Sequence, residues 1–219
     1  MISEKTNYSK YLGMSSALMA ALLTTLFGIF IVLNNPMVYF ITCLFLAMSV
    51  VVMAISLKSF IRIGKKVLAE CAVLFGAMYA ILVSLVYYTQ IAIVLKGTLS
   101  TDLLMIVSDI PGSVFFYIDM FGYCFLCLAT LFIAFAIEGN KVLKGFLFAH
   151  SAIFVPTFLL PFMPIAFSTV QPAAGEVSGP LILVLWCAIF VPVCLLIARY
   201  FYRQQTNPQS IDLSLTSGA

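Results

Sequence analysis

Charged residues are scarce in this sequence. Only 9% of its 219 residues are Asp, Glu, Lys or Arg, whereas 63% are hydrophobic. A soluble chain of this length would have too little polar surface to cover its apolar residues. The shortage of charge therefore excludes an ordinary soluble domain, and we expect membrane lipid to surround most of the chain.

Motifs that name a reaction or a cofactor are also missing. The sequence has no P-loop, no G-x-S-x-G or H-E-x-x-H pattern and no dinucleotide-binding fingerprint. One histidine with scattered carboxylates does not make a compact zinc site, and no basic run interleaved with aromatic residues favours nucleic acid. We therefore expect no cofactor, no metal ion and no nucleic-acid partner.

Cysteine is present, but not in the places that a disulfide framework requires. All six cysteines fall within long apolar stretches rather than in outer loops, so we expect free thiols. They are Cys43, Cys71, Cys124, Cys127, Cys187 and Cys194. The C-x-x-C spacing of the middle pair leaves a membrane thiol oxidoreductase as a minor alternative, because on one helix these thiols are only i and i+3 neighbours.

What the sequence does contain is six long apolar stretches. A membrane crossing takes about 20 helical residues, so each stretch predicts one transmembrane helix. The first is longer than a signal-peptide core and no cleavage site follows it, so we expect it to be retained. The expected ranges are Leu12–Leu33, Met37–Leu57, Val67–Leu95, Ser113–Ile137, Gly145–Val170 and Pro180–Tyr202.

The predicted fold is an all-α polytopic bundle of six transmembrane helices over residues 1–203. The polar residues 204–219 predict a disordered tail. In this topology every Lys and Arg except Lys96 falls on one side of the membrane. Since short cytoplasmic loops are rich in Lys and Arg, both termini are predicted to be cytoplasmic.

The connections have signals of their own. Asn34, Asn35 and Pro36 predict a tight outer turn, because proline cannot continue the preceding helix. In the longest outer loop, Thr101–Val107 predicts a short helix on the membrane surface, with Ser100 as its N-terminal cap.

Small residues predict the interior faces of two helices, because they let transmembrane helices approach closely. On the first helix they recur at helical spacing: Gly13, Ala17, Ala20, Ala21, Thr24 and Gly28. On the third they are Gly76, Ala80 and Ser84. Trp186, near a predicted span end, is expected to anchor its helix at the outer membrane interface.

Ionisable residues inside the spans are the main functional clue, because a charge in the bilayer is costly and faces a cavity or a partner. Asp119 lies about six residues into the fourth helix, with Tyr123 one turn later on the same face. Tyr87 and Gln90 of the third helix reach a similar depth. These four residues predict an outer ligand or proton site; alternatively, Asp119 only joins the two helices by hydrogen bonds. The same face continues through Cys127, Thr130 and Ala134.

The single histidine, His150, and Glu70 predict a second polar layer at the inner side. An imidazole there carries protons or accepts a hydrogen bond; the alternative is a histidine that faces lipid headgroups. Counted along the helices, Asp119 and His150 lie roughly 15 Å apart across the membrane, so we expect no direct pair.

Two prolines fall near the predicted midplane. Pro156 and Pro192 each lie about eleven or twelve residues into the fifth and sixth helices and predict kinks there. Interrupted helices at this depth often mark substrate sites in transporters, although prolines are also tolerated in membrane helices by packing alone.

Three segments carry a family resemblance. They are Leu85–Gln90, Phe116–Tyr123 and Leu128–Phe132, with the Tyr-x-x-Gln and Asp-x-x-Gly-Tyr patterns. In these residues the chain resembles small bacterial six-helix membrane proteins of unknown function. The resemblance implies a bacterial cytoplasmic (inner) membrane and no particular activity.

Three functional hypotheses follow. The first is small-solute or ion-coupled transport, or ligand binding, at the intramembrane polar site. The second is an accessory or sensor subunit with a membrane-protein partner or a second copy of itself. The third is a membrane-embedded enzyme, which requires the polar groups to meet at one depth. A transporter needs a hydrated cavity around Asp119, whereas a subunit has a dry core and an apolar face for its partner.

Overall fold

The computed structural model describes residues 2–162 and 178–204, and the long elements within them are helices. Six helical stretches are long and apolar enough to cross a membrane. The predicted class, an all-α bundle of six apolar helices, is therefore confirmed, while the predicted tail falls almost entirely outside the described residues. The elements are α1 (Ile2–Val32), α2 (Pro36–Lys58), η1 (Ile63–Lys65), α3 (Lys66–Ala92), η2 (Val94–Lys96), α4 (Thr101–Val107), α5 (Val114–Ala136), α6 (Lys141–Ser151), α7 (Phe154–Leu159), η3 (Leu160–Phe162) and α8 (Ser178–Arg203).

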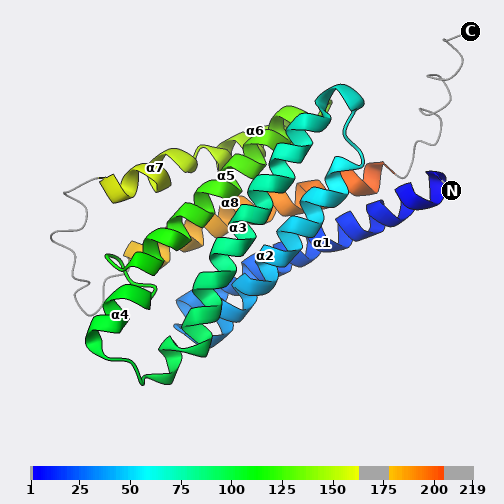
Figure 1. Ribbon diagram of the computed structural model, residues 1–219. Helices are drawn as coiled ribbons and strands as arrows, with labels where there is room; N and C mark the ends of the chain where they lie inside the picture. The colour runs from blue at the N-terminus through cyan, green and yellow to red at the C-terminus, as the bar shows by residue number, and fades with distance from the viewer. Residues whose placement is uncertain (1, 163–177, 205–219) are drawn as a thin grey trace, which may run out of the picture.

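The long helices form a closed ring. α1 packs on α2, α2 on α3, α3 on α5, and α5 on α6, so neighbours in the chain are neighbours in space. α8 packs against both α1 and α6 and closes the ring (Figure 1). Large buried side chains from several helices fill its centre, among them Phe27, Tyr79, Tyr123, Trp186 and Phe190.

The connections sort to the two ends of the bundle. The start of α1, the end of α8 and the α2–α3 and α5–α6 connections lie at one end, and α4 lies at the other (Figure 1). We call these the basic end and the α4 end, because the first holds Lys58, Arg62, Lys65 and Glu138.

Side chains with a capping oxygen set where the helices begin. Asn35 accepts from the backbone N–H of Val38 at 3.3 Å, after Asn34 has turned the chain with a positive φ of 51°. Ser113 caps α5 and Asn140 caps α6 in the same way. Each oxygen satisfies a backbone N–H that has no partner within the helix, and the predicted tight turn before α2 is confirmed.

The short helix α4 has the predicted bounds. Ser100 occupies the position before its first turn, but the Ser100 side chain makes no capping hydrogen bond. The prediction of a serine cap was therefore wrong, although the position was right.

The predicted fifth helix is not continuous. It ends at Ser151 as α6 and resumes at Phe154 as α7, which gives way to η3 at Leu160. Pro156 has no N–H to give to the carbonyl of Ala152, and its ring disfavours helical geometry in the residue before it. The carbonyl of Ala152 instead accepts from the backbone N–H of Val155 at 3.3 Å, so a tighter turn interrupts the regular helix before Pro156. Residues 163–170 of the predicted helix lie outside the described residues.

Pro192 behaves differently, because α8 continues through it to Arg203. Pro192 still has no N–H for the carbonyl of Ala188. Both residues line a shallow apolar groove between α1 and α8, of about 580 Å³.

The small-residue faces lie where the sequence predicts them. All six small residues of the α1 stripe are buried, and so are Gly76 and Ala80 of α3, while Ser84, the third residue of that face, is half-buried. Gly13 lies directly beneath the ring of Phe201 from α8. On α5, a Cβ added to Gly122 would lie only 2.8 Å from Cγ2 of Val83. Small residues thus allow the closest helix approaches, as expected for packing in lipid.

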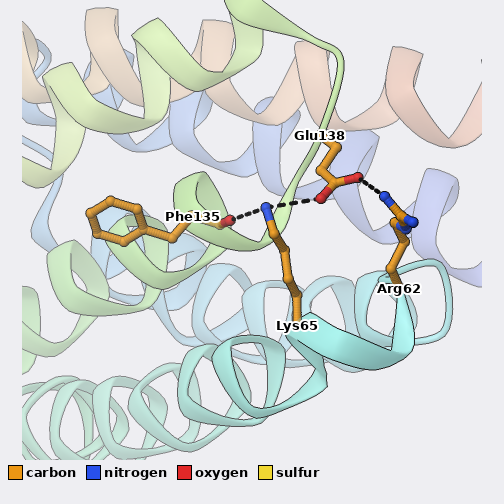
Figure 2. A network of polar contacts seen from close by, with 4 residues as sticks. All are labelled: Arg62, Lys65, Phe135 and Glu138. Carbon is orange, nitrogen blue, oxygen red and sulfur yellow. Dashed lines mark hydrogen bonds and ion pairs between the residues drawn. The ribbon is translucent and has the colours of Figure 1, made fainter.

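Ion pairs hold the basic end together. Glu138, between α5 and α6, pairs with Arg62 at 2.9 Å and with Lys65 at 3.0 Å (Figure 2). Lys65 also donates to the carbonyl of Phe135 at 3.2 Å. Hydrogen bonds from Arg62 and Lys65 hold the pKa of Glu138 below its ordinary value. The bond between Arg62 and Glu138 also raises the pKa of Arg62. This network joins the α2–α3 connection to the α5–α6 connection.

Candidate intramembrane polar site

The candidate site lies on the polar face of α5. Asp119 is only 2% exposed there. The residues predicted to share its face are also buried: Tyr123, Cys127, Thr130 and Ala134. This face points into the ring, so the helical spacing of its polar residues correctly predicted their burial.

Asp119 lies at one end of a chain of hydrogen bonds. Tyr87 Oη donates to Asp119 Oδ2 at 3.1 Å and lies 3.2 Å from Tyr123 Oη. Tyr123 Oη in turn lies 3.5 Å from Sγ of Cys43 on α2. Each of these three donors has one proton. With Asp119 ionised, the donors can only run in one order, from Cys43 through Tyr123 and Tyr87 to the carboxylate.

Two buried oxygens near this chain have no hydrogen-bond partner within the described part of the protein. They are Oδ1 of Asp119 and the hydroxyl of Tyr79. Tyr79 is fully buried on α3, with its ring 5.8 Å from that of Tyr123, and it interacts electrostatically with Cys43 and Asp119. We call Cys43, Tyr79, Tyr87, Asp119 and Tyr123 the outer cluster. A buried polar atom without a partner costs about 1–3 kcal/mol, which favours binding of a proton or a small polar ligand.

Gln90 was expected beside Asp119, but its side chain binds the backbone at the end of α4 instead. Its Nε2 donates to the carbonyl of Val107 at 2.7 Å, and its Oε1 accepts from the backbone N–H of Asp109 at 3.2 Å. Both ends of the amide are thus used to hold the end of α4 against α3. Gln90 thus holds the α4 end of the bundle, and its amide is not directed to the outer cluster.

Asp109 is a member of this region that the sequence interpretation missed. It is partly buried in the turn between α4 and α5 and interacts electrostatically with Asp119 and Tyr87. Burial raises the pKa of the Asp109 carboxyl to about 7. The available signal was its place just before Pro111 and Gly112, where the chain turns back towards the membrane.

Asp109 leads to a pH prediction. Between about pH 4 and pH 7 the folded protein keeps a proton on Asp109 that the unfolded chain releases, so the free energy of unfolding falls as the pH rises. Because the side chain is partly exposed, solvent screening limits this loss to about 1–2 kcal/mol. Asp109→Asn should remove it, as measured by unfolding in SDS titrations at about pH 4 and pH 8.

The control for this prediction is Asp102→Asn, which changes an exposed carboxyl on α4. This variant should keep the pH dependence of the wild type. An equal slope in wild type and Asp109→Asn would contradict the assignment.

His150 has two partners and is completely buried. Trp186 Nε1 donates to His150 Nε2 at 3.1 Å, and His150 Nδ1 lies 2.9 Å from Thr130 Oγ1. An indole N–H can only donate, so Nε2 carries no proton. Because the Thr130 hydroxyl donates to the carbonyl of Cys127 at 2.9 Å, its oxygen accepts from Nδ1. The geometry therefore assigns a neutral imidazole protonated at Nδ1. We call Thr130, His150 and Trp186 the inner cluster.

The expected inner layer of His150 and Glu70 does not form. Glu70 is exposed and pairs with Lys58 at 3.1 Å, whereas His150 is 0% exposed. The two were predicted from depth alone, and depth does not say which face of a helix a residue occupies. Burial also contradicts the alternative in which His150 faces lipid headgroups.

The expectation that Trp186 anchors its helix at the membrane interface is wrong. It is 6% exposed and lies at the centre of the ring rather than at the membrane interface. Its indole stacks on Phe190 at 5.1 Å and meets the edge of Tyr123 at 5.1 Å and 83°. A buried acceptor, His150, satisfies its N–H, and that partner cannot be read from the residues around Trp186 in the chain.

The described residues contain no group of three or more His, Cys, Asp or Glu side chains placed to hold a metal ion. The six cysteines, all of which the structure describes, are free. The fold and the site define an all-helical membrane bundle with a buried carboxyl among tyrosine hydroxyls. Comparison of the chain with protein-family models, curated proteins and solved structures found no match.

Proposed function

We propose that this integral membrane protein binds a proton at Asp119 and couples it to the movement of a small solute or ion. The observation that carries the proposal is the state of Asp119: one carboxyl oxygen accepts from Tyr87 and the other is buried without a partner. A carboxylate buried in this way is costly unless it is paired or neutralised.

The position of the cations supports a proton rather than a permanent ion pair. Within the described residues, the ion pairs involve Lys58, Arg62 and Lys65 at the basic end. None of them includes Asp119. A bound proton is the smallest species that removes its charge, and the hydroxyls of Tyr87 and Tyr123 provide groups along which protons move.

A second candidate, an accessory or sensor subunit, has an observation in its favour. Two apolar grooves open on the outer surface, one between α1 and α2 and one between α1 and α8. Neither is lined by Asp119, and aromatic side chains fill the centre of the ring. Native mass spectrometry separates the candidates: a protein partner at fixed stoichiometry favours the subunit, and a lone protomer or homo-oligomer with a small bound molecule favours the transporter.

We also propose that the basic end faces the cytoplasm of a bacterial cell. The clustering of Lys and Arg at this end supports the orientation through the preference of cytoplasmic loops for positive charge. The start of α1 and the end of α8 would then both be cytoplasmic.

Infrared spectroscopy of the purified protein tests the proton site. A neutral carboxyl in an apolar site gives a C=O stretching band that its ionised form lacks. We expect a band that shifts in D₂O, responds to pH and is lost in Asp119→Asn. The control, Asp102→Asn, should keep this band, because Asp102 is exposed.

The outcome that would overturn the proposal is equally direct. If wild type and Asp119→Asn have the same carboxyl bands over the whole range of pH at which the protein stays folded, Asp119 does not bind a proton. The residue would then be a hydrogen-bonded link between α3 and α5, and the subunit hypothesis would be preferred.

A further inference from the structure

The inner and outer clusters are connected through one side chain. The indole of Trp186 gives its N–H to His150 at 3.1 Å and packs against the ring of Tyr123 at 5.1 Å. Tyr123 is the hydroxyl that lies 3.2 Å from Tyr87, which donates to Asp119. Every step from His150 to Asp119 is therefore a direct contact between buried side chains.

We propose that His150 and Trp186 are positioning residues for Asp119, and that Asp119 and Trp186 respond to each other's state. The proposal rests on the proposed function in one respect, since it takes Asp119 as the proton-binding group. His150 fixes the indole by its hydrogen bond, the indole fixes the ring of Tyr123, and Tyr123 fixes the hydroxyl that binds Asp119.

The packing around Trp186 explains why it transmits displacement. Its faces and edges contact rings from several helices: Phe27 of α1, Tyr123 of α5, His150 of α6 and Phe190 of α8. A close-packed interior has little free space, so a ring held on several sides moves only together with its neighbours.

The hydrogen-bond directions make the link specific to the neutral imidazole. Nε2 of His150 accepts from an indole N–H, which cannot itself accept. A second proton on His150 would place two N–H groups against each other and break this bond. His150 is not among the titratable groups that interact electrostatically with Asp119. These are Asp109 from the turn after α4, Tyr79 and Tyr87 from α3, Cys43 from α2 and Tyr123 from α5 itself.

Coupling between two sites must act in both directions, and the chain has a built-in reporter. Trp186 is the only tryptophan in the sequence, so intrinsic tryptophan fluorescence reports on this position alone. We expect Asp119→Asn to change the emission spectrum or lifetime of Trp186, although Asp119 does not touch it in the described contacts. Asp102→Asn, the matched control, should leave the emission unchanged.

The reverse experiment follows the carboxyl band of Asp119. His150→Leu removes the acceptor for the indole, and we expect the proton affinity of Asp119 to change about five-fold or more, the lower end of typical coupling. His150→Gln should restore the wild-type band, because an amide can accept from Trp186 and donate to Thr130. Should His150→Leu fail to fold, Trp186→Phe offers a second test, since it keeps an aromatic ring near Tyr123 but removes the N–H together with part of the indole.

The two proposals fail in different ways. If Asp119→Asn keeps every carboxyl band of the wild type, the proton site is overturned. The response of Trp186 emission to the same substitution still tests the coupling. If that emission is the same in wild type and Asp119→Asn, or if the histidine and tryptophan variants lower stability while the Asp119 band keeps its frequency and pH midpoint, the positioning role is wrong. A merely structural role would alter stability alone.

Discussion

Gly13→Ala is expected to lower the free energy of unfolding by about 1–3 kcal/mol, the usual cost of overpacking a close-packed site. A Cβ at Gly13 would overlap the ring of Phe201 on α8. Phe201 is fully buried and packs edge-on against Phe60 at 5.6 Å, so its ring has no free space to enter. The contact of α1 with α8, which closes the ring of helices, would have to open. Unfolding in SDS titrations measures the loss.

The control is Gly145→Ala on α6. No atom lies within 4 Å of a Cβ at Gly145, and the residue is exposed. Alanine in an open helical position should be neutral or stabilising by about 0.5–1 kcal/mol. If the two alanine variants had equal stability, the close approach of α1 and α8 at Gly13 would be incorrect.

Trp186→Ala is expected to be the other large loss, at about 2–3 kcal/mol. In a soluble core such a truncation costs about 3–5 kcal/mol. Here the hydrophobic part is smaller, because the unfolded chain also remains among apolar tails. The variant loses packing against Phe27, Tyr123 and Phe190. It also loses the hydrogen bond from the indole, so Nε2 of His150 has no donor. The same titrations measure it.

Phe45→Ala is the matched control for this large-to-small change. Phe45 is 61% exposed on α2, where lipid replaces whatever contacts its ring loses. We expect a change below about 0.5 kcal/mol. A loss in Trp186→Ala no larger than in Phe45→Ala would show that the indole is not part of a packed centre.

The filled core of the bundle limits how a proton could reach Asp119. Aromatic rings occupy the centre, so the proton that we propose at Asp119 would have to move along hydroxyl groups rather than through a wide water-filled passage. Towards the α4 end lies Asp109, which interacts electrostatically with Asp119. Gln90 holds the adjacent backbone of Asp109 and the end of α4, so the side of the cluster towards the α4 end is covered by a segment with its own hydrogen bonds.

Local signals in the sequence predicted the elements well where the physics is local. Hydrophobic length predicted six spans, because a bilayer demands about 20 apolar helical residues from each. Asn34, Asn35 and Pro36 predicted the tight turn, since their conformational preferences act within three residues. The small-residue stripe of α1 and the polar face of α5 predicted which sides are buried, because helical periodicity is a property of the chain itself.

The partners across the ring could be decided only by the tertiary structure. Depth placed Glu70 and His150 in one layer, but helix rotation exposes one and buries the other. Trp186 fits an interfacial position by residue type, yet a histidine 36 residues earlier in the chain accepts its N–H in the core. Gln90 likewise reaches Val107 and Asp109 rather than Asp119.

The sequence by itself thus determined the all-helical membrane class, the number of spans and the buried face that carries Asp119. The sequence also predicted Tyr87 beside Asp119 and an irregularity at Pro156. Only the tertiary structure decided that Gln90 binds Val107 and Asp109 instead, and that Trp186 contacts both clusters. The physical reason is the range of the forces involved. Span length and periodicity depend on neighbours in the chain, whereas hydrogen bonds between helices depend on rotations and offsets that the packing of the whole ring sets together.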